Sequence, residues 1–136
     1  MGIYVKRVVL NSDELYEWYS KQIPGEIYEP GSFHVTIAYS YKDPDRPVNL
    51  NHDSIVVRNP IREIHTFGEY TVMTINNVIL QERFQYFMEH GCSYDYDEYR
   101  PHISIMKRPC TNTIIPFNGT IILGEEILKP LNEDNE

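Results

Sequence analysis

Two short segments of the chain repeat one pattern, in which a histidine is followed by an apolar residue, a hydroxyl residue and a second apolar residue. The first copy is His34–Ile37 and the second is His102–Ile105. Because side chains alternate between the two faces of a strand, each extended segment places its histidine and hydroxyl on one face and its apolar residues on the other. The pattern therefore predicts two strands, each buried on one side and presenting an imidazole and a hydroxyl on the other.

A third His-x-Ser sequence, at residues 52–54, is interpreted as a coincidence. It follows a turn-like run rich in Asp and Pro at residues 43–47, and its middle residue is Asp53, where a strand buried on its back face needs an apolar side chain. The two complete copies are separated by about half of the chain. This spacing indicates two similar lobes.

The length and the cysteines indicate one domain that needs neither a disulfide nor a metal ion to fold. A chain of 136 residues can bury a sizeable core, and we expect a single domain over residues 1–131 and a disordered acidic tail at residues 132–136. Cys92 and Cys110 fit no disulfide or zinc pattern. The absence of a long apolar run and of a signal peptide predicts a cytoplasmic protein that does not bind membranes.

The net charge of −8 argues against DNA or extended RNA as a partner, because such binding depends on many lysines and arginines. A small nucleotide needs only local positive charge. Five cations lie in or beside the important strands and could supply it, namely Lys6, Arg7, Arg100, Lys107 and Arg108. The composition therefore favours a small anionic ligand over a nucleic acid.

Periodicity and turn residues predict an α+β fold. The predicted strands cover residues 3–10, 34–39, 54–58, a hairpin over 62–75, a short edge strand 78–80, and 102–107, 119–123 and 127–128; the predicted helices cover residues 12–23 and 81–90. Each half contains strand, helix and histidine strand in that order. We expect a duplicated two-lobe arrangement in which the histidine strands lie side by side in an antiparallel sheet, with helices on the outer faces and a central cleft.

Two histidines and two hydroxyls on one surface suit metal-free cleavage of a phosphodiester. One imidazole can remove the proton of a ribose 2′-OH while the other protonates the departing 5′ oxygen, since the pKa of imidazole lies near neutrality. Thr36 and Ser104 can donate hydrogen bonds to the phosphate oxygens, whose charge grows in the transition state. Zinc binding by His34 and His102 is the competing interpretation, although no third ligand accompanies them in the sequence. No cofactor is expected.

The two motif blocks, Phe33–Ser40 and Tyr99–Ile105, resemble those of the two-histidine (2H) phosphoesterase superfamily. With the opening Gly2–Lys6 and the late Leu123–Glu126, the chain is most similar to the anti-CBASS nucleases of T4-like phages. This resemblance implies a metal-independent enzyme, acting in the bacterial host cytoplasm during infection. It would cleave 3′-5′ bonds of cyclic di- and trinucleotides such as 3′3′-cGAMP that contain at least one adenine, and thereby block CBASS immunity.

Carried over by position, the resemblance makes His34, Thr36, His102 and Ser104 the catalytic residues. It further suggests that Tyr4 stacks on a base and that Glu125 accepts a hydrogen bond from an adenine amino group. Two alternatives remain open at this point. One is an RNA 2′,3′-cyclic phosphodiesterase that processes RNA ends, and the other is a binding protein that sequesters a cyclic nucleotide. The preferred nucleotide, the order in which the histidines act and the oligomeric state do not follow from the sequence.

Overall fold

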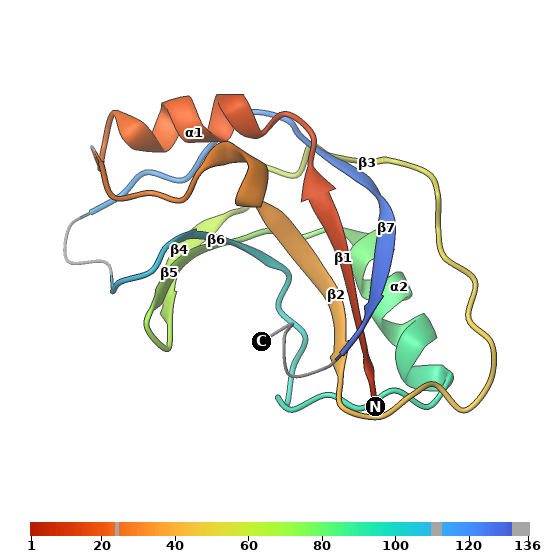
Figure 1. The fold of residues 1–136 in the computed structure, drawn as a ribbon. Helices are drawn as coiled ribbons and strands as arrows, with labels where there is room; N and C mark the ends of the chain where they lie inside the picture. The colour runs from red at the N-terminus through yellow and green to blue at the C-terminus, as the bar shows by residue number, and fades with distance from the viewer. Residues whose placement is uncertain (24, 110–112, 132–136) are drawn as a thin grey trace.

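The computed structural model describes residues 1–23, 25–109 and 113–131, which form seven strands, two α-helices and one short 3-10 helix. Figure 1 shows these elements along the chain. In order they are β1 (Ile3–Val9), α1 (Ser12–Ser20), η1 (Pro30–Ser32), β2 (His34–Ser40), β3 (Ile55–Val57), β4 (Glu63–Phe67), β5 (Tyr70–Thr74), α2 (Val78–Glu89), β6 (His102–Met106) and β7 (Ile121–Pro130).

All seven strands join one open antiparallel sheet in the order β3-β7-β1-β2-β6-β5-β4 (Figure 1). The two histidine strands, β2 and β6, are neighbours at its centre and pair through Val35 and Ile103. Both of these residues are fully buried, so the motif histidines and hydroxyls occupy the opposite face. The α+β class and the adjacent histidine strands are confirmed.

The sheet consists of two similar lobes that meet at the β2–β6 pair. In the first lobe β1, α1 and β2 follow one another, and in the second lobe β5, α2 and β6 do the same. β1 pairs with β2 along nearly its whole length, as β5 does with β6. The predicted duplication therefore corresponds to two strand-helix-strand units, with β7 and β3 added outside the first and β4 outside the second.

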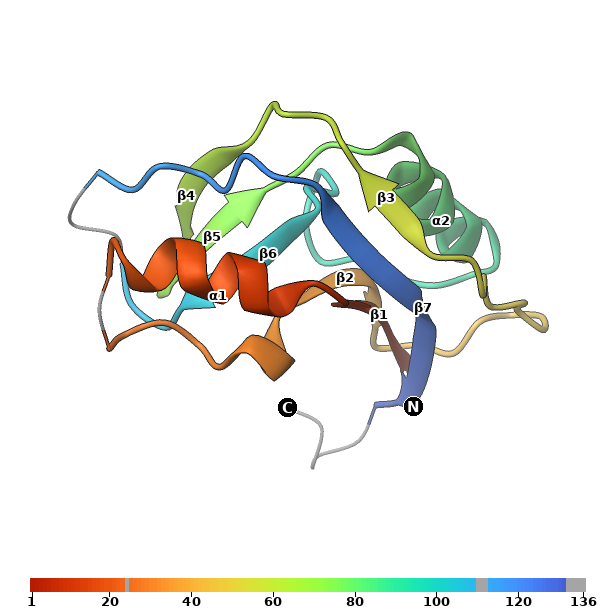
Figure 2. The same ribbon diagram turned by 90° about the horizontal axis from the view of Figure 1, so that it is seen from above.

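Each helix lies against the lobe formed by the other unit. The Tyr19 hydroxyl of α1 donates to the Met73 sulfur of β5 over 3.0 Å, whereas Arg83 of α2 contacts Glu126 of β7. Figures 1 and 2 show α1 over the β4–β6 region and α2 beside β1, β2 and β7. Both helices contribute to a single core, as shown by the buried Leu15 of α1 and Phe87 of α2. Neither described helix is long and apolar enough to cross a membrane.

A buried charge cluster joins β1, β7, α2 and the connection between β2 and β3. Arg7 and Glu126 are fully buried, with 3.5 Å between guanidinium and carboxylate, and Arg83 reaches the same carboxylate at 2.7 Å. The Arg7 guanidinium also donates to the backbone oxygens of Asp53 and Gly124. Because a buried charge needs such partners, the cluster attaches the β2–β3 connection to the sheet.

Two of the predicted elements are wrong in detail. Residues 78–80 form the first turn of α2 and not an edge strand, because the Asn77 side chain accepts hydrogen bonds from the backbone of Ile79 and Leu80 and caps the helix. The separate strands predicted at 119–123 and 127–128 are joined in one strand, β7 (Ile121–Pro130), which stays paired with β1 through Leu123, Glu126 and Ile127 despite a register shift. Cys92 is buried as a free thiol. Cys110 and the predicted tail at 132–136 lie outside the described residues.

Candidate active site

The strand register brings the four motif side chains into two adjacent rows across the sheet. Because β2 and β6 are antiparallel and pair at Val35 and Ile103, Thr36 lies opposite His102 and His34 lies opposite Ser104. Directly opposed side chains have Cβ atoms about 5 Å apart, and the diagonal pair of histidines is about 7–8 Å apart. Each imidazole therefore has a hydroxyl of the other lobe beside it.

The neighbouring strands extend both rows. Lys6 of β1 pairs with Thr36, and Thr74 of β5 pairs with His102, which completes one row. In the other row, Val8 pairs with His34 and Val72 pairs with Ser104. The surface that carries both rows, on the side of the sheet opposite the core, is called the histidine face below.

Both imidazoles are held in the same orientation by the same local contact. His34 Nδ1 lies 2.7 Å from the Ser32 carbonyl oxygen, and His102 Nδ1 lies 2.8 Å from the Arg100 carbonyl oxygen. A carbonyl oxygen only accepts hydrogen bonds, so Nδ1 carries the proton in each ring. In the neutral tautomer Nε2 is consequently the basic nitrogen of both histidines, and it is the atom available for proton transfer.

The pKa of each motif histidine is lowered from 6.5. For His34 the main cause is burial, and the positive charge of Lys6 lowers the pKa further. For His102 burial is again the largest cause, followed by repulsion from a protonated His34 and from Arg100. The hydrogen bonds to the two backbone carbonyls act in the opposite direction. The effect of the His34 charge on His102 is expected for two imidazoles that share one region of the histidine face.

Tyr4, predicted as a base-stacking residue, lies directly against the first histidine. Its hydroxyl is 2.9 Å from His34 Nε2, and the two rings meet edge to face at 6.3 Å. Burial raises the pKa of the Tyr4 phenol, partly offset by a hydrogen bond from Thr36, so the phenol is protonated at neutral pH and can donate to Nε2. The structure thus brings Tyr4 to the motif residues, in contact with the basic nitrogen of His34.

The second histidine has an aromatic neighbour that the sequence analysis missed. The Phe67 ring of β4 meets His102 edge to face at 5.0 Å, and the guanidinium carbon of Arg100 lies 4.8 Å from the centre of the same ring. Phe67 shares one side of β4 with Glu63 and His65, because alternate residues of a strand point to the same face. This alternation could not assign Phe67 to the site, because only the pairing of β4 with β5, and of β5 with β6, brings the ring to His102.

Tyr99 connects the two motif strands from the core side. Its hydroxyl donates a hydrogen bond of 2.6 Å to the Thr36 backbone oxygen, and its buried ring stacks on Phe84 of α2 with 4.3 Å between centres. Burial keeps the pKa of Tyr99 far above neutrality, so it remains a donor. Since Tyr99 lies three residues before His102, this bond fixes the start of β6 relative to β2.

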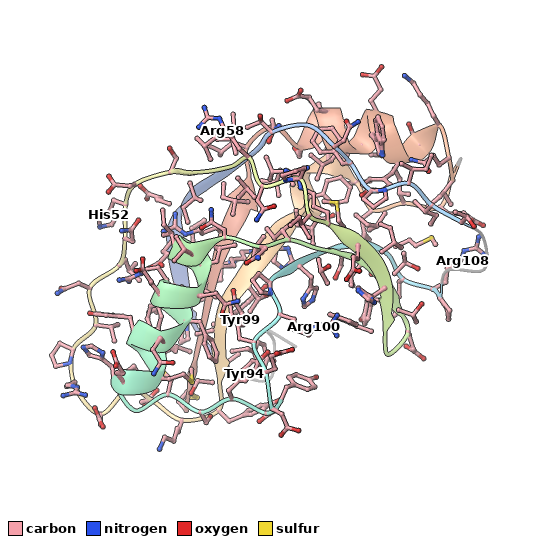
Figure 3. The ribbon with its side chains drawn as sticks, turned by 180° about the vertical axis from the view of Figure 1, so that it is seen from behind. His52, Arg58, Tyr94, Tyr99, Arg100 and Arg108 are labelled. Atoms are coloured by element: carbon pink, nitrogen blue, oxygen red, sulfur yellow. The ribbon has the colours of Figure 1, made fainter. Side chains whose placement is uncertain are left out.

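A cavity of about 260 Å³ lies beside His102 at the outer end of the second lobe. None of the four motif residues lines this cavity, but two of its lining residues are direct neighbours of His102: Thr74 pairs with it across the strands, and Pro101 precedes it in the chain. Figure 3 shows Tyr99 and Arg100 on the segment that leads into β6. The polar residues that line the cavity are Glu63, Thr74, Asn76, Gln81, Glu98 and Arg100.

Glu125, the other predicted binding residue, lies away from this cavity. Its carboxylate is 3.7 Å from His52 Nδ1, which belongs to the β2–β3 connection, and both side chains are largely exposed. Figure 3 shows His52 at one edge of the molecule, well separated from Arg100. The third His-x-Ser sequence therefore lies outside the strands of the site. Among the described residues, no three His, Cys, Asp or Glu side chains are placed to hold a metal ion together.

Comparison with known proteins gives consistent matches. A family model described as "Anti-CBASS protein Acb1" matches residues 1–136. Proteins of that description from Caulobacter sp. (strain RHG1) and Sphingomonas paeninsulae are each 25% identical, over 142 and 146 residues. These alignments cover 96% and 97% of this chain but 23% of each relative. The chain thus spans about a quarter of the length of the curated relatives it matches.

Solved structures share the fold. A crystal structure of a phosphoesterase has a TM-score of 0.62 at 10% identity, and the match covers 93% of this chain and 86% of that one. Escherichia coli LigT in complex with 3′-AMP has a TM-score of 0.59 at 12% identity, with 93% and 85% covered. At such low identity these matches establish the common fold, and the side chains of the site have to be judged from their own geometry.

Proposed function

This chain belongs to the family of anti-CBASS protein Acb1, and on that premise we propose that it is a phosphodiesterase that cleaves 3′-5′ bonds in cyclic di- and trinucleotides. The observation that carries the proposal is the pair of histidines on one face, with both Nδ1 atoms bound to backbone carbonyls, so that Nε2 is the basic nitrogen of each ring, and with His34 Nε2 in contact with the Tyr4 hydroxyl. Linearising the messenger would block the CBASS response. The protein would therefore act inside the infected host cell.

The proposed reaction needs one neutral and one protonated imidazole. Nε2 of the neutral ring removes the proton of the ribose 2′-OH, and the 2′ oxygen forms a bond to the adjacent phosphorus. The bond from phosphorus to the 5′ oxygen breaks, and Nε2 of the protonated ring donates its proton to that oxygen. The products are a 2′,3′-cyclic phosphate and a free 5′-OH. With the roles of the rings reversed, water opens the cyclic phosphate.

The hydroxyls of Thr36 and Ser104 stabilise the charge that develops on the phosphate. Each lies opposite a histidine in the strand register, so both are within reach of a phosphorus held between the rings. Hydrogen bonds to a phosphate oxygen strengthen as that oxygen gains charge, which lowers the barrier. Tyr4, in contact with His34 Nε2, supplies a further hydroxyl at the same position.

The cavity beside His102 provides space for a nucleoside attached to the scissile phosphate. The carboxamides of Asn76 and Gln81 line it, and a carboxamide can both donate to and accept from the edge of adenine. LigT was solved with 3′-AMP, an adenine nucleotide. These observations support a substrate with at least one adenine and leave the contribution of Glu125 as a prediction.

The test is incubation with a panel of cyclic di- and trinucleotides and an RNA ending in a 2′,3′-cyclic phosphate, followed by chromatography. We expect cleavage of cyclic oligonucleotides. Cleavage of the RNA end alone would indicate RNA processing, and binding without cleavage would indicate sequestration. Activity should survive EDTA, whereas inhibition by the chelator would favour the zinc interpretation.

The first prediction concerns the histidines in this assay. His34→Ala and His102→Ala should each lower kcat by about 10²–10⁴-fold, because each removes a proton-transfer group. His52→Ala is the matched control, since this exposed histidine lies outside the site. Circular dichroism should show that all three variants are folded. Full turnover in either motif variant would exclude the mechanism.

A further inference from the structure

The two motif histidines are surrounded by the same three-part arrangement. His34 contacts the Tyr4 ring, and the Lys6 ammonium lies 5.7 Å from the centre of that ring. His102 contacts the Phe67 ring, and the Arg100 guanidinium carbon lies 4.8 Å from its centre. Each lobe therefore places a cation on an aromatic ring that touches its histidine, at distances typical of cation–π contacts.

These two cations differ from the arginines that have structural roles. Arg7 and Arg83 bind the Glu126 carboxylate, and Arg108 binds Glu26. Within the part of the chain that the structure describes, neither Lys6 nor Arg100 forms a salt bridge with a carboxylate. Their aromatic neighbours hold the side chains in place without neutralising their charge, so both remain able to bind an anion.

The location of these cations is unusual for a chain with a net charge of −8. An acidic protein repels phosphate, so a phosphate site needs local positive charge. Lys6 belongs to the first lobe and pairs with Thr36, whereas Arg100 contacts Phe67 in the second lobe. Each cation lies against an aromatic ring that contacts a motif histidine, so both are close to a phosphate bound between the two imidazoles.

We propose that Lys6 and Arg100 form a phosphate clamp that binds the uncut phosphates of the substrate while the histidines act on the scissile one. This inference rests on the proposed function. A cyclic dinucleotide has one uncut phosphate and a cyclic trinucleotide has two, whereas a dinucleoside monophosphate has none. The clamp thus selects cyclic oligonucleotides over substrates with a single phosphate.

The experiment compares the best-cleaved cyclic oligonucleotide with adenylyl-(3′→5′)-adenosine, which has one phosphate. Wild-type enzyme should have the lower kcat/KM for the one-phosphate substrate. The Lys6→Met/Arg100→Met double variant should raise the KM for the cyclic substrate by about tenfold or more, because charge-assisted bonds to phosphate are lost. Its KM for the one-phosphate substrate, where cleaved, should change less than about twofold, since this substrate has no uncut phosphate for the clamp.

Three further measurements separate the clamp from a general effect of charge. Arg58→Met removes the same charge at an exposed position that Figure 3 shows well separated from Arg100, and it should leave KM unchanged. Lys6→Arg and Arg100→Lys retain the charge and should keep KM near the wild-type value. The dependence of KM on salt should become weaker in the double variant.

Several results would overturn the clamp. Equal KM increases for both substrates would mean that the cations serve the scissile phosphate, and an increase in Arg58→Met would indicate a long-range charge effect. Unchanged KM in the double variant would exclude phosphate binding by these residues. Wild-type enzyme that cleaves no cyclic oligonucleotide would instead refute the proposed function, so the two failures are distinguishable.

Discussion

At the residue scale, the proposed reaction assigns opposite proton-transfer roles to two histidines that have the same local contacts. Each ring donates Nδ1–H to the carbonyl oxygen two residues earlier, so the backbone at the start of each strand selects the tautomer. Burial then lowers the pKa of both rings. The free protein therefore keeps both imidazoles largely neutral at pH 7, and the protonated imidazole that the proposed reaction needs is the scarcer form.

A pH prediction follows from these shifts. The histidine that acts as the base must be unprotonated, so it is active above its lowered pKa. The histidine that acts as the acid must be protonated, so its activity falls as the pH rises above its lowered pKa. We therefore expect a bell-shaped kcat/KM with its maximum below pH 6.5, and a kcat maximum at higher pH, because the bound phosphate anion favours protonated imidazole. Initial rates between pH 4.5 and 9 would check both. A kcat/KM maximum above pH 6.5 would contradict the shifts.

The residues of the site were predictable only in part. A repeated His-x-Thr/Ser pattern carries its own geometry, since alternation along a strand places both side chains on one face, and this identified four motif positions. Phe67 and Tyr99 have no comparable local signature. Their roles depend on which strands pair and on how the segment before β6 reaches β2, and these long-range contacts cannot be inferred from local spacing.

At the element scale, the critical contact is the one between β2 and β6. These strands come from different units, so the distance between the histidines depends on how the two lobes are joined. The Tyr99 hydroxyl bonds to Thr36 across this junction and is fixed by the stacked Phe84 ring. Tyr99 is thus a positioning residue, since it acts through the motif strands and the substrate does not have to touch it.

We predict that Tyr99→Phe keeps the fold but loosens the junction. The ring still stacks on Phe84, while the loss of one buried hydrogen bond should lower stability by about 1–3 kcal/mol. A shift of about 1 Å between catalytic groups can reduce turnover by about 10²-fold, so kcat should fall more than KM rises. Steady-state kinetics with urea unfolding would test this. Tyr94→Phe, in the same aromatic group, is the control and should retain kcat.

Sequence patterns located most elements but misassigned those at boundaries. Val78, Ile79 and Leu80 are apolar and partly β-branched, which suggested a strand, yet the Asn77 cap makes them the start of a helix. The polar pair Glu125 and Glu126 interrupts the apolar pattern of β7, which predicts two separate strands there. Glu126 nevertheless faces the interior, where Arg7 and Arg83 neutralise it. In both cases a specific hydrogen bond or ion pair outweighs the local apolar pattern.

At the scale of the whole molecule, the buried charge cluster connects parts of the chain that are distant in sequence. Arg7, Arg83 and Glu126 come from β1, α2 and β7, and Asn51 bonds to both Arg7 and Glu126. Removing one member leaves the others charged and buried, which is far more costly than losing a surface ion pair.

Glu126→Gln should therefore lower the free energy of unfolding by about 3–5 kcal/mol. Glu125→Gln is the matched control, because this neighbouring residue on β7 is exposed, and it should change stability by less than about 0.5 kcal/mol. Urea denaturation followed by circular dichroism measures both. Equal stability of the two variants would show that the cluster contributes little net energy.

Because each helix lies against the opposite unit, neither unit can form a covered core by itself. A fragment containing only one strand-helix-strand unit would leave the apolar side of its strands uncovered, and its helix would have nothing to cover. Two identical fragments could cover their apolar strand faces only if each placed its helix on the strands of the other, as in a domain-swapped dimer. Covalent continuity between the two units is what allows each helix to cover the strands of the other within one molecule.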